Sequence, residues 1–182
     1  MRELSLHISD ILENSRVSGA SLIQLGIKED MERDRLEITI TDNGRGMEKE
    51  LTERVFDPFV TSRTCRKVGL GLPLLKAAAQ RCNGDVEIRS EVGQGTSVSS
   101  VFQHTHIDRA PLGNIVDSLF VFVAANPELD LVYTHEVEGR NFILDTRELR
   151  EELEGVPLNT PSVLNWIRNY LREGLQEIKS CA

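Results

Sequence analysis

The sequence predicts an α+β fold, a two-layer sandwich in which helices cover one face of a mixed, mainly antiparallel sheet. Apolar residues alternate with polar ones, as in half-buried strands, in four segments: 21–29, 36–41, 85–91 and 96–102. Helical spacing of apolar residues marks 3–17 and 73–82. These helices interleave with hairpins and not with regular single strands, which favours this fold over a doubly wound parallel sheet.

Length and composition limit the kind of protein. The chain has 182 residues, of which 40% are apolar, enough for one sizeable core and a small appended unit. Its net charge of -8 argues against a dedicated nucleic-acid binder. We find neither a signal peptide nor an apolar run of membrane-spanning length, so we expect a cytoplasmic protein without membrane contact. The odd number of cysteines, without metal-ligand spacing, predicts free reduced thiols at Cys65, Cys82 and Cys181.

The first predicted helix, 3–17, carries two polar side chains beside its apolar stripe. Asp10 and Asn14 stand four residues apart and therefore point the same way. The Asn14 carbonyl oxygen is a ligand that Mg²⁺ accepts beside water and phosphate oxygens, and Asp10 could orient or deprotonate a nucleophile. A solvated helix face is the alternative interpretation.

Two neighbouring strands follow this helix. Gly19 suits the helix C-terminus, and the strand at 21–29 leads through a charged turn at 31–35 into the strand at 36–41. Because sequential strands usually lie side by side, we expect these two to pair.

The loop Asp42-Asn43-Gly44-Arg45-Gly46-Met47 comes directly after the second strand, a position at which loops often bind ligands. The Asp42 carboxylate can accept a hydrogen bond from an exocyclic amine, while Gly44 and Gly46 let a flat ring approach the backbone. The loop is therefore a candidate adenine site. Asp-Asn-Gly is also a common turn sequence, so an ordinary turn stays open as an alternative.

A short helix is expected at 48–55, ended by Pro58, and a polar, basic segment at 60–68 could close over an anion. Gly69-Leu70-Gly71-Leu72-Pro73 then leads into the helix that runs to about Cys82, with Pro73 in its first turn. Free amides at such a helix start bind phosphate. The segment lacks the Lys-Ser/Thr pair of a P-loop and the third glycine of the dinucleotide fingerprint.

After the strand pair at 85–91 and 96–102, the pattern breaks near residue 104. We therefore divide the chain into a domain at 1–103 and an α/β extension at 104–182. The extension contains an apolar run, a hairpin turning at 138–140, and a helix with Pro161 in its first turn; these cover 114–125, 130–144 and 160–178. His104, His106 and His135 show no clear partner, and we interpret them as structural.

Taken together, the motifs resemble those of the GHKL ATP-binding superfamily over residues 1–103. The shared pattern, in order, is Asp10-x-x-x-Asn14, Asp42-x-Gly44-x-Gly46, the segment 56–63, Gly69-x-Gly71 and Gly95-Thr96. The segment 56–63 looks most like histidine kinases, whereas 12–15 followed by Gly19-Ala20 is also similar to mismatch-repair ATPases; heat-shock chaperone ATPases belong to the same superfamily. The resemblance implies the Bergerat-type ATP-binding fold.

The resemblance also implies residue roles. Asn14 would coordinate Mg²⁺, Asp42 would bind the adenine amine, Gly44 and Gly46 would make room for the base, and Thr96 would support Asp42 or a bridging water. Near the phosphates and the lid it implies roles for Phe56, Phe59, Arg63, Gly69, Leu70 and Gly71. Phe56 and Phe59 would shape the lid hinge, Arg63 would reach the phosphates, and the last three would cradle them. We count Met47 and Leu72 as nucleotide-binding as well.

Three departures from the family pattern bear on the reaction. Asp10 stands where hydrolytic members carry Glu, so we expect slow hydrolysis with Asp10 as the catalytic residue. Val17 replaces a basic residue that many histidine kinases place near the phosphates. In this sequence no helix pair before residue 3 presents a phosphoacceptor histidine, and His7 lies within the nucleotide-site helix.

We therefore expect an Mg-ATP-binding protein that is either a protein kinase acting on a separate protein partner or a slow ATPase. The alternative is a nonenzymatic ATP sensor whose lid at 60–68 controls the binding of a partner. We expect the extension at 104–182 to be a packed regulatory unit, and it could instead form a homodimer.

Overall fold

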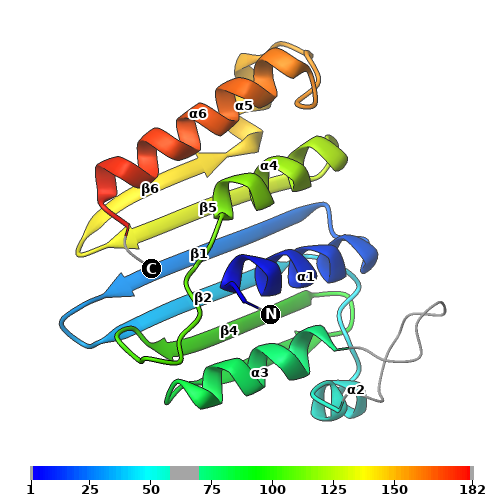
Figure 1. The fold of residues 1–182 in the computed structure, drawn as a ribbon. Helices are drawn as coiled ribbons and strands as arrows, with labels where there is room; N and C mark the ends of the chain where they lie inside the picture. The colour runs from blue at the N-terminus through cyan, green and yellow to red at the C-terminus, as the bar shows by residue number, and fades with distance from the viewer. Residues whose placement is uncertain (1, 58–69, 181–182) are drawn as a thin grey trace.

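A computed structural model describes residues 2–57 and 70–180 (Figure 1). The N-terminal part contains α1 (Leu4–Val17), β1 (Leu22–Asp30), β2 (Arg35–Asp42), α2 (Lys49–Arg54), α3 (Gly71–Arg81), β3 (Asp85–Glu91) and β4 (Gly95–Gln103). The C-terminal part contains α4 (Ile115–Ala125), β5 (Asp130–Val137), β6 (Arg140–Asp145), α5 (Thr146–Glu152) and α6 (Pro161–Ile178). The predicted α+β class is confirmed.

The described strands form one mixed sheet in the order β3-β4-β2-β1-β5-β6. The pairs β1–β2, β2–β4, β3–β4 and β5–β6 are antiparallel, and only β1–β5 is parallel among these pairs. The expected pairing of the first two strands is confirmed, with Ile23 opposite Asp42. Since Thr96 also lies opposite Asp42, three strands meet at the candidate loop.

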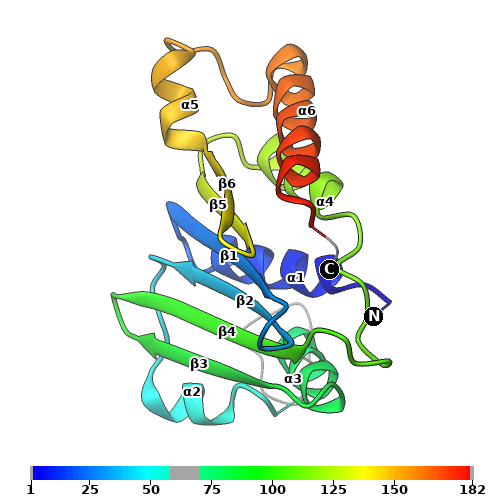
Figure 2. The same ribbon diagram turned by 90° about the vertical axis from the view of Figure 1, so that its left-hand side faces the viewer.

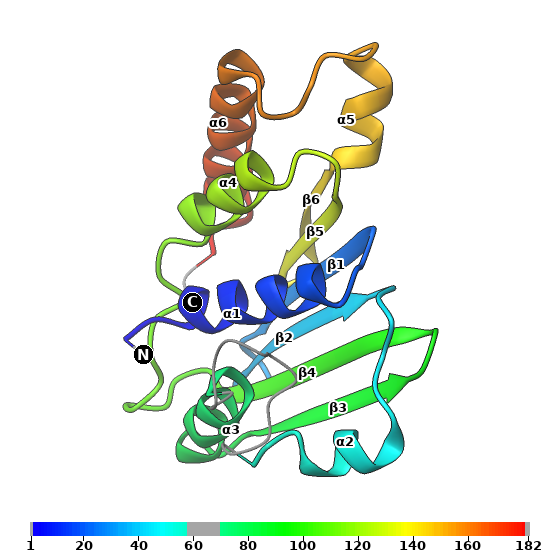
Figure 3. The same ribbon diagram turned by 90° about the vertical axis from the view of Figure 1, so that its right-hand side faces the viewer.

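A row of helices covers one face of this sheet. Figures 1 and 3 show α3, α1, α4 and α6 side by side on that face, and α1 contacts both α3 and α4. The apolar residues on the sheet-facing side of α1 and those of the central strands that face the helices are almost fully buried; Leu12, Ile23, Leu36 and Leu131 have no exposed surface. In the view of Figure 2, α2 lies apart from this row, beside β3.

Local capping explains two elements that periodicity left open. The apolar run after residue 114 forms α4, because Asn114 Oδ1 accepts a hydrogen bond from Asp117 N at 3.0 Å and so caps the helix. The helix α5 was not predicted; it is short, and it starts where Asp145 Oδ1 accepts from Arg147 N at 2.9 Å. The helix α3 begins at Gly71, two residues before the predicted start, which still leaves Pro73 in its first turn.

The C-terminal extension continues the same sheet, because β5 pairs with β1 from Leu22 to Glu29. Glu29 of β1 binds side chains from the extension at this junction. Its carboxylate is buried, with His135 Nε2 at 2.8 Å and His104 Nε2 at 3.2 Å, and it accepts from Ser180 Oγ at 2.7 Å. The partner of His104 and His135, which could not be assigned from the sequence, is thus Glu29, as expected for residues with a structural role.

Tyr133 completes this buried polar cluster. Its hydroxyl lies 2.7 Å from His135 Nδ1. Burial, helped by the negative charge of Glu29, raises the pKa of Tyr133 far above its usual range, so the hydroxyl keeps its proton. Side chains from β1, β5, the segment after β4 and the segment after α6 therefore meet at one point.

The sequence predicted no membrane-spanning segment and free cysteine thiols. Among the described residues, no helix combines the length and apolar character that crossing a membrane requires. Cys82 is a buried free thiol, as expected, whereas Cys65 and Cys181 lie outside the described residues.

Candidate functional site

The candidate site lies at the end of β2, where the loop 42–47 runs between the C-terminal end of α1 and the β3–β4 hairpin. Asp42 is its central residue and is only 8% exposed. Its Oδ2 accepts from Ser15 Oγ at 2.7 Å and its Oδ1 accepts from Gly44 N at 2.9 Å. A carboxylate oxygen can accept more than one hydrogen bond, so the orientation of Asp42 is fixed while acceptor capacity remains.

Close packing explains the glycines in and beside this loop without any ligand. A Cβ at Gly44 would lie 1.9 Å from Ser18 Oγ. Gly46 has φ +66°, and a Cβ there would lie 1.9 Å from the Glu91 carbonyl oxygen. Gly95, with φ +100°, would place a Cβ 1.9 Å from the carbonyl oxygen of Asp42. At Gly46 and Gly95 a Cβ would meet backbone atoms, so only glycine lets those segments pack so closely beside Asp42.

Side chains on both sides anchor the loop. Asn43 Oδ1 accepts from the backbone amides of Ser21 and Leu22, both at 2.9 Å. On the hairpin side, Ser90 Oγ accepts from Met47 N at 2.9 Å and also lies 2.9 Å from Thr96 Oγ1. Thr96 is therefore linked to Met47 through Ser90 and lies opposite Asp42 in the sheet.

The helices α1 and α3 form the second part of the site. A Cβ at Gly71 would lie 3.4 Å from Asp10 Oδ2, so the Asp10 side chain packs against the first turn of α3. Asn14 follows one turn later on α1 and is half-buried. The N-cap residue of α3, Leu70, makes no side-chain capping hydrogen bond, and backbone amides at a helix start can bind an anion. Leu70 is exposed and Leu72 is half-buried.

Of the two residues predicted to shape the lid hinge, the structure describes Phe56. Phe56 is half-buried and packs against the core, with Lys76 Nζ 4.1 Å from the centre of its ring. The structure does not describe the predicted lid at 60–68, nor Phe59, Arg63 and Gly69.

The described donor set suits Mg²⁺ bound with phosphate and not a preformed metal centre. Among residues 2–57 and 70–180, no three His, Cys, Asp or Glu residues group so that they could hold a metal ion. Mg²⁺ in phosphate sites takes one or two protein ligands and completes its shell with phosphate oxygens and water. Asn14, one turn from Asp10, whose side chain packs against the start of α3, fits that pattern.

Sequence reasoning missed three residues that hold the site together: Ser15, Asn43 and Ser90. A signal existed for Ser15, because it continues the buried stripe of Ile8 and Leu12 with a hydroxyl, and a polar group in such a stripe needs a partner. Asn43 was attributed to the turn alone. For Ser90 there was no signal, since its contact with Met47 depends on how the β3–β4 hairpin packs against the loop.

Comparison with known proteins agrees with this geometry. Residues 2–106, more than half of the chain, match the model of the histidine kinase-, DNA gyrase B-, and HSP90-like ATPase family. The fold and the loop thus define an ATP-binding domain of the GHKL type. The chain belongs to this family.

Curated relatives include histidine kinases. Sporulation kinase D of Bacillus subtilis (strain 168) is 33% identical over 97 residues, which are 51% of this chain and 19% of that protein. Sensor histidine kinase YxdK of the same organism is 31% identical over 104 residues, 54% of this chain and 32% of that protein. The chain therefore matches only a minor part of the length of these relatives.

Solved structures share the fold beyond the family segment. The N-terminal domain of a DNA repair protein aligns with 80% of this chain and 53% of its own, at a TM-score of 0.56 and 14% identity. The Aquifex aeolicus MutL ATPase domain, solved with ADP, aligns with 85% of this chain and 68% of its own, at a TM-score of 0.50 and 17% identity.

Proposed function

We propose that this protein binds Mg-ATP between the loop 42–47 and the helices α1 and α3. We further propose that it transfers phosphate to a separate protein or hydrolyses ATP slowly. The observation that carries the proposal is the buried Asp42 carboxylate, fixed by Ser15 and Gly44 in an ATP-binding family fold. Residues 1–103 would form the ATP-binding domain and 104–182 a regulatory extension.

Adenine recognition follows from the fixed acceptor. The exocyclic amine of adenine would donate to Asp42, and Thr96 would support this contact directly or through a water molecule. Guanine presents a carbonyl oxygen at the equivalent position and would leave the buried acceptor facing another acceptor. ATP should therefore bind better than GTP.

The phosphates would lie at the start of α3, where first-turn amides and the helix dipole favour negative charge. Leu70, Gly71 and Leu72 would supply that backbone, and Asn14 would hold Mg²⁺ there. When bound, Mg²⁺ neutralises charge that develops on the transferred phosphoryl group. As the family resemblance implies, Arg63 would reach the phosphates from the lid, Gly69 would help to cradle them, and Phe59 would shape the lid hinge.

The described histidines favour an acceptor on another protein. Burial lowers the pKa of His7 to about 4, and its side chain is 3% exposed. His104 and His135 are buried against Glu29, and His106 Nδ1 accepts from Asp108 N at 3.1 Å. The buried His7, His104 and His135 are not presented for in-line attack, so we propose that phosphate passes to a partner or to water, with Asp10 as the base.

The test combines binding with turnover. Calorimetry should show tighter binding of ATP than of GTP, and Asp42→Asn should weaken ATP binding by about 2 kcal/mol, as for a lost charged hydrogen bond. The exposed Asp108→Asn variant is the matched control and should bind ATP like the native chain. Equal affinities for ATP and GTP would contradict the adenine assignment.

Incubation with γ-labelled ATP then separates the reaction types. We expect slow release of labelled phosphate, with Asp10→Asn removing that activity but retaining ATP binding. ATP binding without release, alone and with candidate partners, would favour the nonenzymatic sensor. Stable phosphohistidine on the purified chain would instead overturn the proposed transfer to a separate acceptor.

A further inference from the structure

A surface hollow of about 460 Å³ lies between α1 and α3, away from the Asp42 loop. It is lined by His7 of α1 and by Leu74, Ala77, Gln80 and Arg81 of α3. Its volume falls in the range of small-molecule sites. The Asp10–Gly71 contact, which borders the proposed nucleotide site, lies about one helical turn from His7 and Leu74, and neither Asp10 nor Gly71 lines this hollow.

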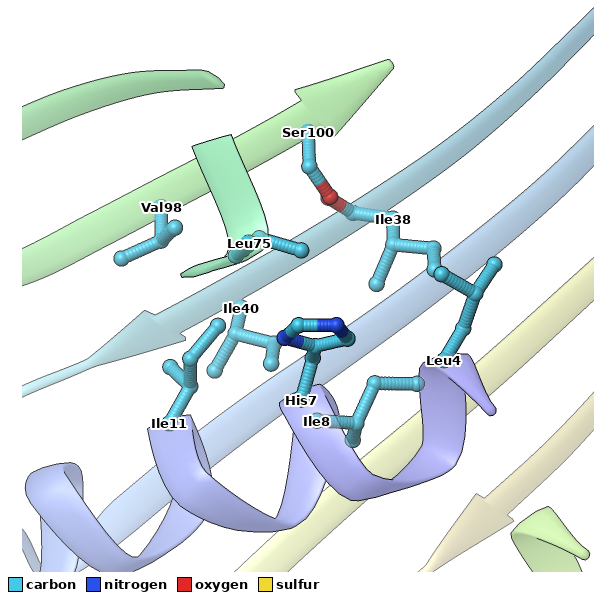
Figure 4. A pocket seen from close by; sticks show the side chains of 9 residues that line it. All are labelled: Leu4, His7, Ile8, Ile11, Ile38, Ile40, Leu75, Val98 and Ser100. Carbon is cyan, nitrogen blue, oxygen red and sulfur yellow. The ribbon is translucent and has the colours of Figure 1, made fainter. Parts of the chain in front are cut away.

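His7 is the unusual residue in its lining. The side chain is 3% exposed, and the described residues offer its Nδ1 no hydrogen-bond partner. The ring also lines an internal cavity of about 10 Å³, whose other lining residues are mostly apolar, and Figure 4 shows it in the middle of these side chains. An unpaired buried nitrogen is costly, and an apolar side chain would pack here without that cost.

Charge gives the hollow a preference for anions. Arg81 is exposed, and no acidic side chain in the described part of the chain forms an ion pair with it. Arg81 lines the same hollow as His7, and burial together with the positive charges of the N-terminus and Arg81 lowers the pKa of His7. This local positive charge contrasts with a chain whose net charge is -8.

Leu74 and Ala77 supply an apolar surface between the two polar groups. Leu74 is 40% exposed although it is a large apolar side chain, and Ala77 is exposed one turn further along α3. A ligand that covers them would remove apolar surface from water, while Gln80 offers an amide at the edge.

We propose that this hollow binds a small carboxylate with an apolar body. The carboxylate pairs with Arg81, the apolar body covers Leu74 and Ala77, and the ligand lies against His7. The site does not depend on the proposed nucleotide chemistry, and neither Arg81 nor His7 belongs to the nucleotide machinery proposed above.

Titration of the full chain with three probes tests the proposal, with the His7 ring nitrogens observed by NMR. Benzoate combines both features, benzyl alcohol carries only the apolar body, and acetate carries only the carboxylate. We expect a saturable shift of the His7 signals with benzoate, and affinities about tenfold or more weaker for the other two probes. Benzyl alcohol binding as well as benzoate, or no saturable shift with benzoate, would overturn the proposal.

Two arginine variants locate the anion contact. Arg81→Gln should weaken benzoate binding by about tenfold or more, because it removes a charged partner from an exposed position without disturbing the core. Arg89→Gln, on β3 and outside the lining of the hollow, removes an exposed arginine that pairs with Glu87 at 2.8 Å and should leave binding unchanged. Equal benzoate affinity in both variants would refute the assigned site.

Discussion

Ser15→Ala tests whether the hydroxyl on α1 holds the Asp42 carboxylate. The Ser15 Oγ to Asp42 Oδ2 bond is 2.7 Å long and buried, and Asp42 is 8% exposed. A hydrogen bond to a charged group contributes about 1.5–3 kcal/mol to stability. The higher helix propensity of alanine offsets about 0.5 kcal/mol of this loss. The net loss of unfolding free energy should therefore be about 1–2.5 kcal/mol, which lowers the Tm of a chain of this size by about 2–10 °C.

The same substitution should weaken nucleotide binding, because the acceptor for the adenine amine loses the bond that orients it. ATP and ADP should lose affinity equally, since both carry the base, and the loss should be about 3–10-fold, as for one support contact. Thermal unfolding by circular dichroism and calorimetry with both nucleotides measure the two effects.

Ser9→Ala is the matched control for this experiment. Ser9 lies on the same helix, is half-buried, and within the described residues donates to the carbonyl oxygen of Ser5 at 2.9 Å. Such a local bond contributes little to helix stability, so this variant should resemble the native chain. Ser15→Ala and Ser9→Ala with the same Tm and the same ATP affinity would refute the supporting role of Ser15.

Three further outcomes are expected. Asn14→Ala should weaken binding of Mg-ATP far more than binding of adenosine while the helix content stays unchanged; an unaltered magnesium dependence would contradict the metal role. Truncation after Gln103 should cause aggregation, because it removes β5 from the edge of β1 and strips Glu29 of its buried partners; a soluble, monodisperse fragment with native ATP affinity would disprove this. Hydrogen bonds from Gln103, Thr105 N and Thr105 Oγ1 lower the pKa of Asp34 in the folded protein. The ionised Asp34 carboxylate therefore stabilises the fold above the pKa that it has in the unfolded chain, and this stabilisation is lost as pH falls through its pKa in the folded protein. Asp34→Asn, which tolerates the local φ of +50°, should flatten that acid-side loss in pH-dependent unfolding, and an unchanged slope would exclude the effect.

The sequence alone was sufficient for features with local causes. Apolar periodicity predicted the N-terminal strands and helices to within a few residues, because alternation and helical spacing record which face of an element is buried. Pro73 and Gly19 indicated where helices start and end for equally local reasons. The ordered set of motifs around Asp42 and Gly71 was enough to indicate the superfamily to which the chain belongs.

Only the tertiary structure decided which faces meet. Periodicity shows that Glu29 points inward but not that His135, more than a hundred residues later, lies 2.8 Å from it. The parallel pairing of β5 with β1 and the bond from Ser15 to Asp42 likewise join segments far apart in the chain. Such partners depend on strand order and helix packing. The residues next to a side chain in the sequence do not indicate which distant residue will be its partner.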